Sequence, residues 1–206
     1  MSEDMATSTN IPLFPLQTVL YPGSLLPLRI FEARYLDMIS ASLRNGTPFG
    51  IVPIRHGREV GAAPAFFPFG SLAAIESFDQ GADGLLHLRV LGGARFRVER
   101  HELRSDLLLV ADITRVADAE DQAIPTDLSY LSALLDDIFK SNAEHIPYSD
   151  RQMDSALWVA YRLAEILPLP AASKVAVLQA DSGVAALSRL DAGIRAASSP
   201  PAPGSH

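Results

Sequence analysis

The stretch Ile11–Ile39, IPLFPLQTVLYPGSLLPLRIFEARYLDMI, carries the strongest information about the fold of this chain. Its first eighteen residues hold no charged side chain, and four of them are prolines. Proline removes a backbone donor and disfavours a helical conformation at the preceding residue. The run therefore predicts two short strands, Ile11–Leu16 and Leu25–Ile30, with a type II turn between them at Tyr21–Ser24.

From Phe31 onward the apolar spacing changes from that of a strand to that of a helix. Phe31, Tyr35, Met38 and Ile39 recur at helical intervals. We expect Glu32 in the first turn, where a negative charge suits the helix dipole. The helix should end at Asn45-Gly46, because glycine readily takes the left-handed conformation found just beyond helix ends.

The segment 71–116 has the alternation of apolar and polar residues that is typical of strands. Ser71–Ser77 is one predicted strand, and Leu107–Val116 is the last and longest. Between them, Gly92-Gly93 predicts a tight turn or a bulge. With a further strand at Phe49–Ile54, these short strands indicate a small barrel or a sandwich.

After residue 126 the apolar spacing is helical to the end of the folded chain. Ser149 and Gln152 have the spacing of a capping box and predict the start of a helix that runs to Ile166 or Leu167. Asp181 or Ser182 is expected to cap the last helix.

These patterns predict two domains, a β-rich half at 10–118 and a helical half at 126–197. The tails, 1–9 and 198–206, have little apolar surface to bury, and we expect them to be disordered.

Composition limits the classes of function. The chain has 206 residues, no cysteine and a net charge of −7. The absence of cysteine excludes disulfides, cysteine nucleophiles and iron–sulfur clusters. The acidic balance argues against nucleic-acid and anionic-membrane partners. The polar N-terminus lacks signal-peptide features and no transmembrane run is present, so a cytoplasmic location is expected.

The opening stretch resembles the N-terminal substrate-binding domain of the Lon protease family, and in particular the stand-alone bacterial proteins that carry this domain. The similarity continues at Phe69–Ile75 and at Leu167–Pro170 and Lys174. The matching positions of the first block are Pro12, Leu13, Phe14, Pro15, Leu16, Pro22, Gly23, Leu26, Pro27, Leu28, Ile30, Phe31, Glu32, Arg34 and Tyr35.

The resemblance implies an α+β fold: a PUA-like β-barrel with one helix, followed by a C-terminal α-helical bundle. It also implies that the apolar residues of the opening stretch fill the barrel, namely Phe14, Leu16, Val19, Leu26, Leu28 and Phe31.

No catalytic machinery is evident in the sequence. The chain has no G-x-x-x-x-G-K-[ST] phosphate loop, no G-x-S-x-G elbow and no H-E-x-x-H motif. A complete Lon protease carries an ATPase module and a serine–lysine peptidase module, and neither is recognisable here. We therefore predict a non-enzymatic protein without a metal or cofactor.

The resemblance implies binding of unfolded polypeptides or of a partner protein, in the manner of an adaptor or a chaperone. Arg29, Glu32 and Arg34 are candidates for the rim of a binding groove. The alternative for these residues is structural, with Glu32 complementing the helix start and pairing with Arg34 or Arg29.

The loop Ala62–Gly70 supplies the apolar candidates Phe66, Phe67 and Phe69. We expect two of these rings in the core and one exposed for contact with a client, because aromatic groups dominate binding hot spots.

An alternative function is RNA binding by a PUA-like module. Arg89, Arg95 and Arg97 would then form a positive sheet face, although an ordinary solvent-exposed face explains the same pattern. No aromatic side chains alternate with these arginines, which weakens a stacking platform for bases. A small-molecule enzyme with its site between the two halves is a third hypothesis. The oligomeric state is open.

Overall fold

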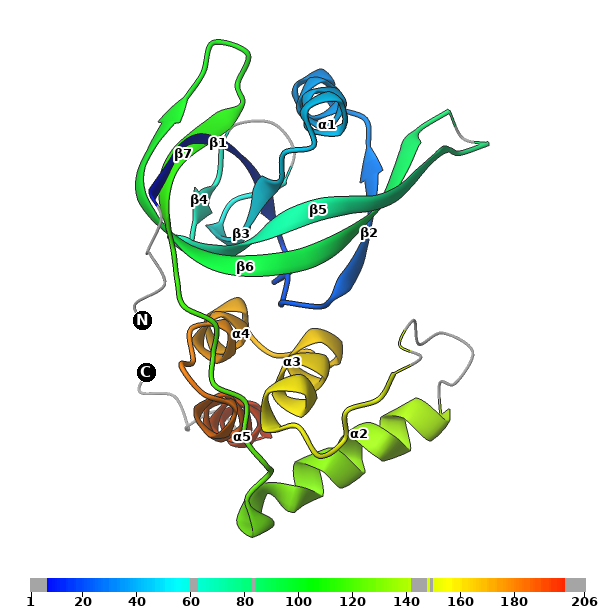
Figure 1. The fold of residues 1–206 in the computed structure, drawn as a ribbon, viewed down its shortest axis with the longest axis vertical. Helices are drawn as coiled ribbons and strands as arrows, with labels where there is room; N and C mark the ends of the chain where they lie inside the picture. The colour runs from blue at the N-terminus through cyan, green and yellow to red at the C-terminus, as the bar shows by residue number, and fades with distance from the viewer. Residues whose placement is uncertain (1–6, 60–62, 83, 142–147, 149, 199–206) are drawn as a thin grey trace, which may run out of the picture. The chain divides into compact units, whose positions relative to one another are not determined.

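The computed structural model describes residues 7–59, 63–82, 84–141, 148 and 150–198 of the chain. The chain separates into two compact units, residues 1–118 and residues 119–206. Among the described residues the strands belong to the first unit, together with one helix, and the other helices belong to the second (Figure 1).

In its described residues the first unit contains seven strands and the helix α1, Ala33–Asn45. The strands are β1 Thr7–Leu16, β2 Leu25–Ile30, β3 Phe49–His56, β4 Ala65–Phe66, β5 Phe69–Gln80, β6 Leu86–Leu103 and β7 Leu109–Arg115. The strands predicted at the start of the chain are present, but Thr7, Ser8 and Thr9 already belong to β1. The expected disordered tail at 1–9 is therefore wrong at these three positions, because β1 starts at Thr7, and Thr7 and Ser8 pair with Thr114 and Ile113 of β7.

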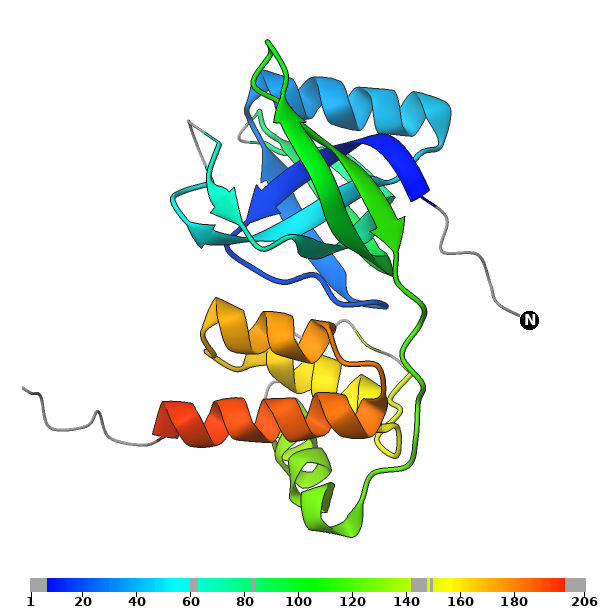
Figure 2. The ribbon, with the colours of Figure 1, turned by 90° about the vertical axis from the view of Figure 1, so that its left-hand side faces the viewer.

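The strands follow a path that returns to its beginning. Neighbours along it are β1, β7, β6, β5 and β3, and β1 also pairs in parallel with β3. The strand β2 lies off this path and pairs with β6. In Figure 2, α1 lies along one side of these crossing strands.

β6 is one continuous strand through Gly92-Gly93, so the turn expected there is absent. The bulge alternative is confirmed, because the register with β5 shifts between Ser71 and Ala73, opposite Arg95 and Gly92. A Cβ atom on Gly92 would lie 2.0 Å from the carbonyl oxygen of Tyr21. Glycine is therefore needed where the chain before β2 crosses closely over β6.

Two apolar clusters fill the first unit. One joins α1 to the strands through residues that include Phe14, Tyr35, Ile39, Phe49 and Val90. The other includes Leu13, Val52, Phe96 and Ile113. The expectation for the opening stretch holds for Phe14, Leu16 and Val19, which are buried, and Leu26 and Leu28 pack partly buried against the first cluster.

The expectation is wrong for Phe31, whose side chain is 55% exposed. Phe31 follows the last residue of β2 and precedes the first turn of α1, so the helical spacing that includes it starts too early. Glu32 occupies the N-cap position of α1 rather than its first turn.

The described part of the second unit contains a short 3₁₀ turn, Thr126–Leu128, and four helices. These are α2 Ser129–Ser141, α3 Ala156–Ile166, α4 Ala171–Leu178 and α5 Gly183–Ser198. Their buried faces carry residues such as Leu131, Phe139, Leu163, Val177 and Leu187. None of the described helices combines the length and the apolar character needed to cross a membrane.

The helix α3 starts later than the capping-box pattern predicts. Ser155 is its N-cap, and the Ser155 hydroxyl accepts a hydrogen bond of 2.9 Å from the Trp158 amide. A second hydrogen bond fixes the start of α3, because the backbone amide of Ala156 donates to the carbonyl of Gln122. Residue 149 lies outside the described residues. For α5 the alternative of Ser182 is confirmed, since its hydroxyl accepts from the Ala185 amide at 3.3 Å.

Candidate polypeptide-binding site

A pocket of about 310 Å³ lies beside β2, between this strand, the end of β1 and the start of α1. We call it the β2 pocket. Its apolar lining includes Phe14, Leu26, Leu28, Ile30, Phe31 and Tyr35. Arg29, Glu32 and Glu59 are its charged residues. The structure therefore brings Arg29 and Glu32, two of the predicted rim residues, to the same apolar pocket.

Stacked aromatic rings form the floor of the β2 pocket. The ring centroids of Phe14 and Tyr35 lie 4.0 Å apart with 23° between the planes, and Phe49 approaches Phe14 at 6.5 Å. Burial raises the pKa of Tyr35 to about 12. The Arg34 guanidinium opposes this rise, and the carboxylates of Glu32 and Glu59 reinforce it. Tyr35 is thus a neutral, largely apolar part of the pocket at physiological pH.

Arg34 lies beneath the β2 pocket, where it has a structural role, and not at the rim of the pocket. Its side chain is 8% exposed, and its guanidinium donates to the Leu107 carbonyl and to the Glu32 carboxylate, each at 2.8 Å. The guanidinium carbon also lies 4.7 Å from the centroid of the Tyr35 ring. The structural alternative, in which Glu32 pairs with Arg34, is confirmed, and Arg34 presents little surface to a client.

Arg29 is exposed and forms no ion pair within the described part of the chain. It lies opposite His87 on β6. Arg29 also borders a second groove of about 600 Å³ on the outer side of β2, which we call the outer groove. Arg89, His87, Asp79 and Phe78 line this groove as well.

A further apolar hollow of about 530 Å³ lies on the other side of Phe31, between α1 and the hairpin that joins β5 to β6. We call it the hairpin hollow. Its apolar lining includes Ile30, Phe31, Leu36, Phe78, Leu85 and Leu86. Phe31 and Phe78 are 55% and 59% exposed, the two highest exposures among the large apolar side chains of the described residues.

Phe78 was missed in the sequence analysis, although its surroundings gave a signal. It is a single aromatic residue between Ser77 and Asp79, just before Gln80-Gly81. A ring among polar residues at the end of a strand has little protein around it to cover it.

The structure separates the predicted phenylalanines of the 62–70 loop from this site. Phe69 is 4% exposed and belongs to the core. Phe66 is half-buried against the second apolar cluster, with its centroid 4.9 Å from that of His101. Phe67 is also half-buried, so none of the three rings has the exposed position expected of one of them. His101 lies near the end of β6, whereas Arg29 pairs near its start.

The three arginines of the predicted RNA-binding face do not share a surface. Arg89 and Arg97 are exposed, but Arg95 is 2% exposed and donates to the Ala117 carbonyl. The prediction of a three-arginine face is therefore wrong at Arg95. Arg95 and Arg97 do lie on the same side of β6, because the pairing with β5 is regular from Arg95 opposite Ser71 to Arg97 opposite Phe69. The Arg95 side chain is nevertheless covered, and its guanidinium is engaged by the backbone that follows β7.

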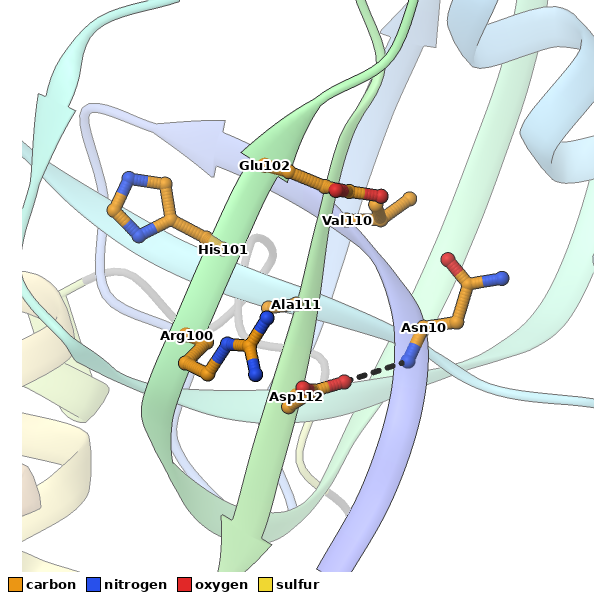
Figure 3. A pocket seen from close by; sticks show the side chains of 7 residues that line it. All are labelled: Asn10, Arg100, His101, Glu102, Val110, Ala111 and Asp112. Carbon is orange, nitrogen blue, oxygen red and sulfur yellow. Dashed lines mark hydrogen bonds between the residues drawn. The ribbon is translucent and has the colours of Figure 1, made fainter.

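A polar pocket of about 320 Å³ lies over β1, β7 and the end of β6 (Figure 3). The backbone amide of Asn10 donates to the Asp112 carboxylate at 3.3 Å. The Arg100 side chain extends toward Asp112, while His101 points away. Its charged groups have no arrangement of nucleophile and base. Among the described residues, no group of three or more potential ligands is placed to hold a metal ion.

The fold and site define a mixed α/β chain whose sheet-rich first unit presents open apolar hollows. Residues 10–190 match the family described as the ATP-dependent protease La (LON) substrate-binding domain, and the chain belongs to this family. The match confirms the resemblance seen in the opening stretch. The matched module is the substrate-binding, non-catalytic part of Lon.

Solved structures agree with this assignment. The crystal structure of a Lon N-terminal domain protein from Xanthomonas campestris is 35% identical, with a TM-score of 0.73, and the match covers 90% of this chain and 98% of that one. The N-terminal domain of a Mycobacterium avium complex Lon protease is 21% identical with a TM-score of 0.62, over 90% and 96% of the two chains. The second likeness supports the fold alone.

Two curated relatives are named as Lon proteases. The Lon protease of Anaeromyxobacter dehalogenans is 27% identical and the Lon protease 2 of Myxococcus xanthus is 28% identical, each over 129 residues or 59% of this chain. The matches cover 15% and 16% of these relatives, so the chain spans less than a fifth of their length.

Proposed function

We propose that this chain is a non-catalytic module that binds unfolded or partner polypeptides, in the manner of an adaptor or a chaperone. Its binding surface is the β2 pocket and the hairpin hollow, with Phe31 between them. The observation that carries the proposal is the exposure of Phe31 and Phe78 beside two apolar hollows.

The dimensions and the chemistry of the surface suit side chains of a polypeptide. Hollows of a few hundred cubic ångströms with apolar lining and few charged groups are typical binding sites. Exposed rings at the centre of such a surface are typical hot spots, because they bury a large apolar area on contact. Membership in a family named for substrate binding supports the same function.

RNA binding is less well supported than polypeptide binding. One of its three arginines is buried, so only Arg89 and Arg97 of the predicted face are exposed.

The two units are further proposed to be domains, with bounds near 10–118 and 126–197. The closed path of strands supports a PUA-like barrel for the first, and the mutually packed α2–α5 helices support a helical bundle for the second. The chain without cysteine suits the reducing cytoplasm.

The test is a titration of a fluorescein-labelled, reduced and carboxymethylated lactalbumin with the full chain, followed by fluorescence anisotropy. The double substitution Phe31→Ser with Phe78→Ser should raise the Kd about tenfold or more, which corresponds to loss of about 1.4 kcal/mol of binding free energy. The matched control is Ile166→Ser, which removes an exposed apolar side chain from α3. Equal binding by the double variant and the unaltered chain would contradict the proposal.

A further inference from the structure

The strand β2 has an open edge. Within the described ranges it pairs with β6 alone, from Leu25 opposite Leu91 to Ile30 opposite Leu86. Pro27 lies in the middle of this strand, opposite Arg89. Proline has no N–H, so its nitrogen in a strand faces away from the partner. In an antiparallel pair, backbone groups alternate between the two sides, so Leu25, Pro27 and Arg29 direct theirs toward the open edge.

The two faces of β2 differ in chemistry. Leu26, Leu28 and Ile30 turn toward the apolar cluster, and the β2 pocket opens beside them. Pro27 and Arg29 are exposed on the other face, which borders the outer groove. An edge strand with an apolar pocket on one face and guanidinium groups on the other can distinguish the alternate side chains of an added strand.

On the outer face, Arg29 is the charged group on the edge strand itself, and the carboxylates of Glu76 and Asp79 lie two strands away on β5. Arg29 forms no ion pair within the described residues. Arg89 contacts Glu76 at 3.9 Å between two side chains that are about half exposed, and such a pair contributes little. Asp79 lies across β6 from Arg29, with His87 between them. On the inner side, the carboxylate of Glu32 is engaged by Arg34 at 2.8 Å.

We propose that the open edge of β2 takes an extended client segment as an added strand, with apolar side chains in the β2 pocket and intervening acidic side chains against Arg29 and Arg89. This inference rests on the proposed function and names its client class, which is a segment of alternating apolar and acidic residues. A residue paired with Arg29 across the new edge shares its face, so a carboxylate at that position meets the guanidinium directly. Pro27 offers a carbonyl but no donor, so Leu25 and Arg29 supply the N–H groups for the added strand and Pro27 adds only an acceptor.

The test compares three fluorescein-labelled peptides with identical apolar residues and with Glu, Gln or Lys at the intervening positions. The Glu peptide should bind about tenfold more tightly than the Gln peptide at 50 mM salt, and the Lys peptide should bind most weakly. The double substitution Arg29→Gln with Arg89→Gln should reduce the affinity for the Glu peptide to that for the Gln peptide and leave the Gln peptide unchanged. The control Arg97→Gln removes an exposed arginine elsewhere on the sheet and should alter neither.

Backbone pairing has a separate readout. N-methylation of the alternate peptide amides that face β2 should weaken binding about tenfold, whereas N-methylation of the other amides should not. Equal affinities for the Glu and Gln peptides, with retained binding of unfolded lactalbumin, would overturn this inference and leave the proposed function intact. Absence of binding to the peptides and to lactalbumin would overturn both.

Discussion

Two groups of phenylalanines in the first unit have opposite environments. Phe66, Phe67 and Phe69 are neighbours in the sequence, yet one is in the core and the others are half-buried. Phe31 and Phe78 are far apart in the sequence, yet they line one hollow and are both more than half exposed. An accumulation of rings in one loop therefore did not indicate an exposed apolar surface.

The difference follows from the position of each residue relative to the sheet. Phe69 is the first residue of β5 and lies opposite Arg97, and β6 continues in both directions from Arg97. Phe78 lies close to the hairpin end of the same strand, and Phe31 lies just beyond the end of β2. Phe69 is also at a strand end, but β6 extends past it to Leu103, whereas Phe78 lies near the hairpin where both strands end.

The largest expected effect is a loss of stability when the buried ring of Phe69 is removed. The substitution Phe69→Ala removes a ring that is almost fully buried and leaves a cavity, so the free energy of unfolding should fall by about 3–5 kcal/mol. Urea unfolding followed by circular dichroism measures the change. A loss below about 1 kcal/mol would show that Phe69 is not part of the core.

The arginines at the two sides of Phe31 give a second contrast. Arg34→Met leaves the Leu107 carbonyl and the Glu32 carboxylate without their donor, so the free energy of unfolding should fall by about 1–3 kcal/mol. Arg29→Met removes an exposed side chain and should change it by about 0.5 kcal/mol at most. Urea midpoints of the two variants provide the comparison, and equal values would argue against the assigned roles.

Alkaline pH tests the buried floor of the β2 pocket. The pKa of Tyr35 is raised to about 12 from 10.0, so between these values the unfolded chain loses the phenolic proton while the folded chain keeps it. Stability should therefore fall as the pH rises from 10 to 12, by about 2 kcal/mol from this residue alone. Tyr35→Phe should flatten that part of the profile in urea unfolding. If Tyr35→Phe leaves the slope of stability against pH unchanged, the Tyr35 hydroxyl is in contact with water in the folded chain.

Only a small effect on stability is expected for the exposed pair. Phe31→Ser with Phe78→Ser removes rings that are mostly in water already, so the free energy of unfolding should change by less than about 1 kcal/mol. The same urea experiment as for Phe69→Ala measures it. A loss as large as that of Phe69→Ala would mean that the two rings stabilise the fold rather than bind a client.

The sequence allowed the arrangement of elements to be predicted better than the site. Prolines and the type II turn residues located β1, β2 and the start of α1, and Asn45-Gly46 located its end, where Gly46 has a φ of 63°. Local rules of this kind act within a few residues. Exposure at Phe31, Phe78 and Arg95 depended instead on pairing between distant strands.

The case of Arg95 shows why such features escape pattern analysis. Alternation along β6 correctly placed it on the same side as Arg97, because the pairing with β5 is regular from Arg95 to Arg97. Arg95 is buried all the same, and its guanidinium donates to the carbonyl of Ala117, which follows β7. No local signal in β6 shows which distant segment covers one of its residues. The apolar candidates failed for a related reason, since loop composition does not report which strands surround the loop.

The return of the strand path to β1 has a consequence for synthesis of the chain. β1 can pair with β3 once Leu13 and Gly50 have both left the ribosome, but Thr7 must wait for Thr114. Contacts between residues so distant in sequence slow folding, because a long loop is ordered before they form. A nascent chain that ends before Leu109 therefore leaves an edge of β1 and an edge of β6 without the strand that joins them, and it depends on its surroundings to keep both from pairing with other chains.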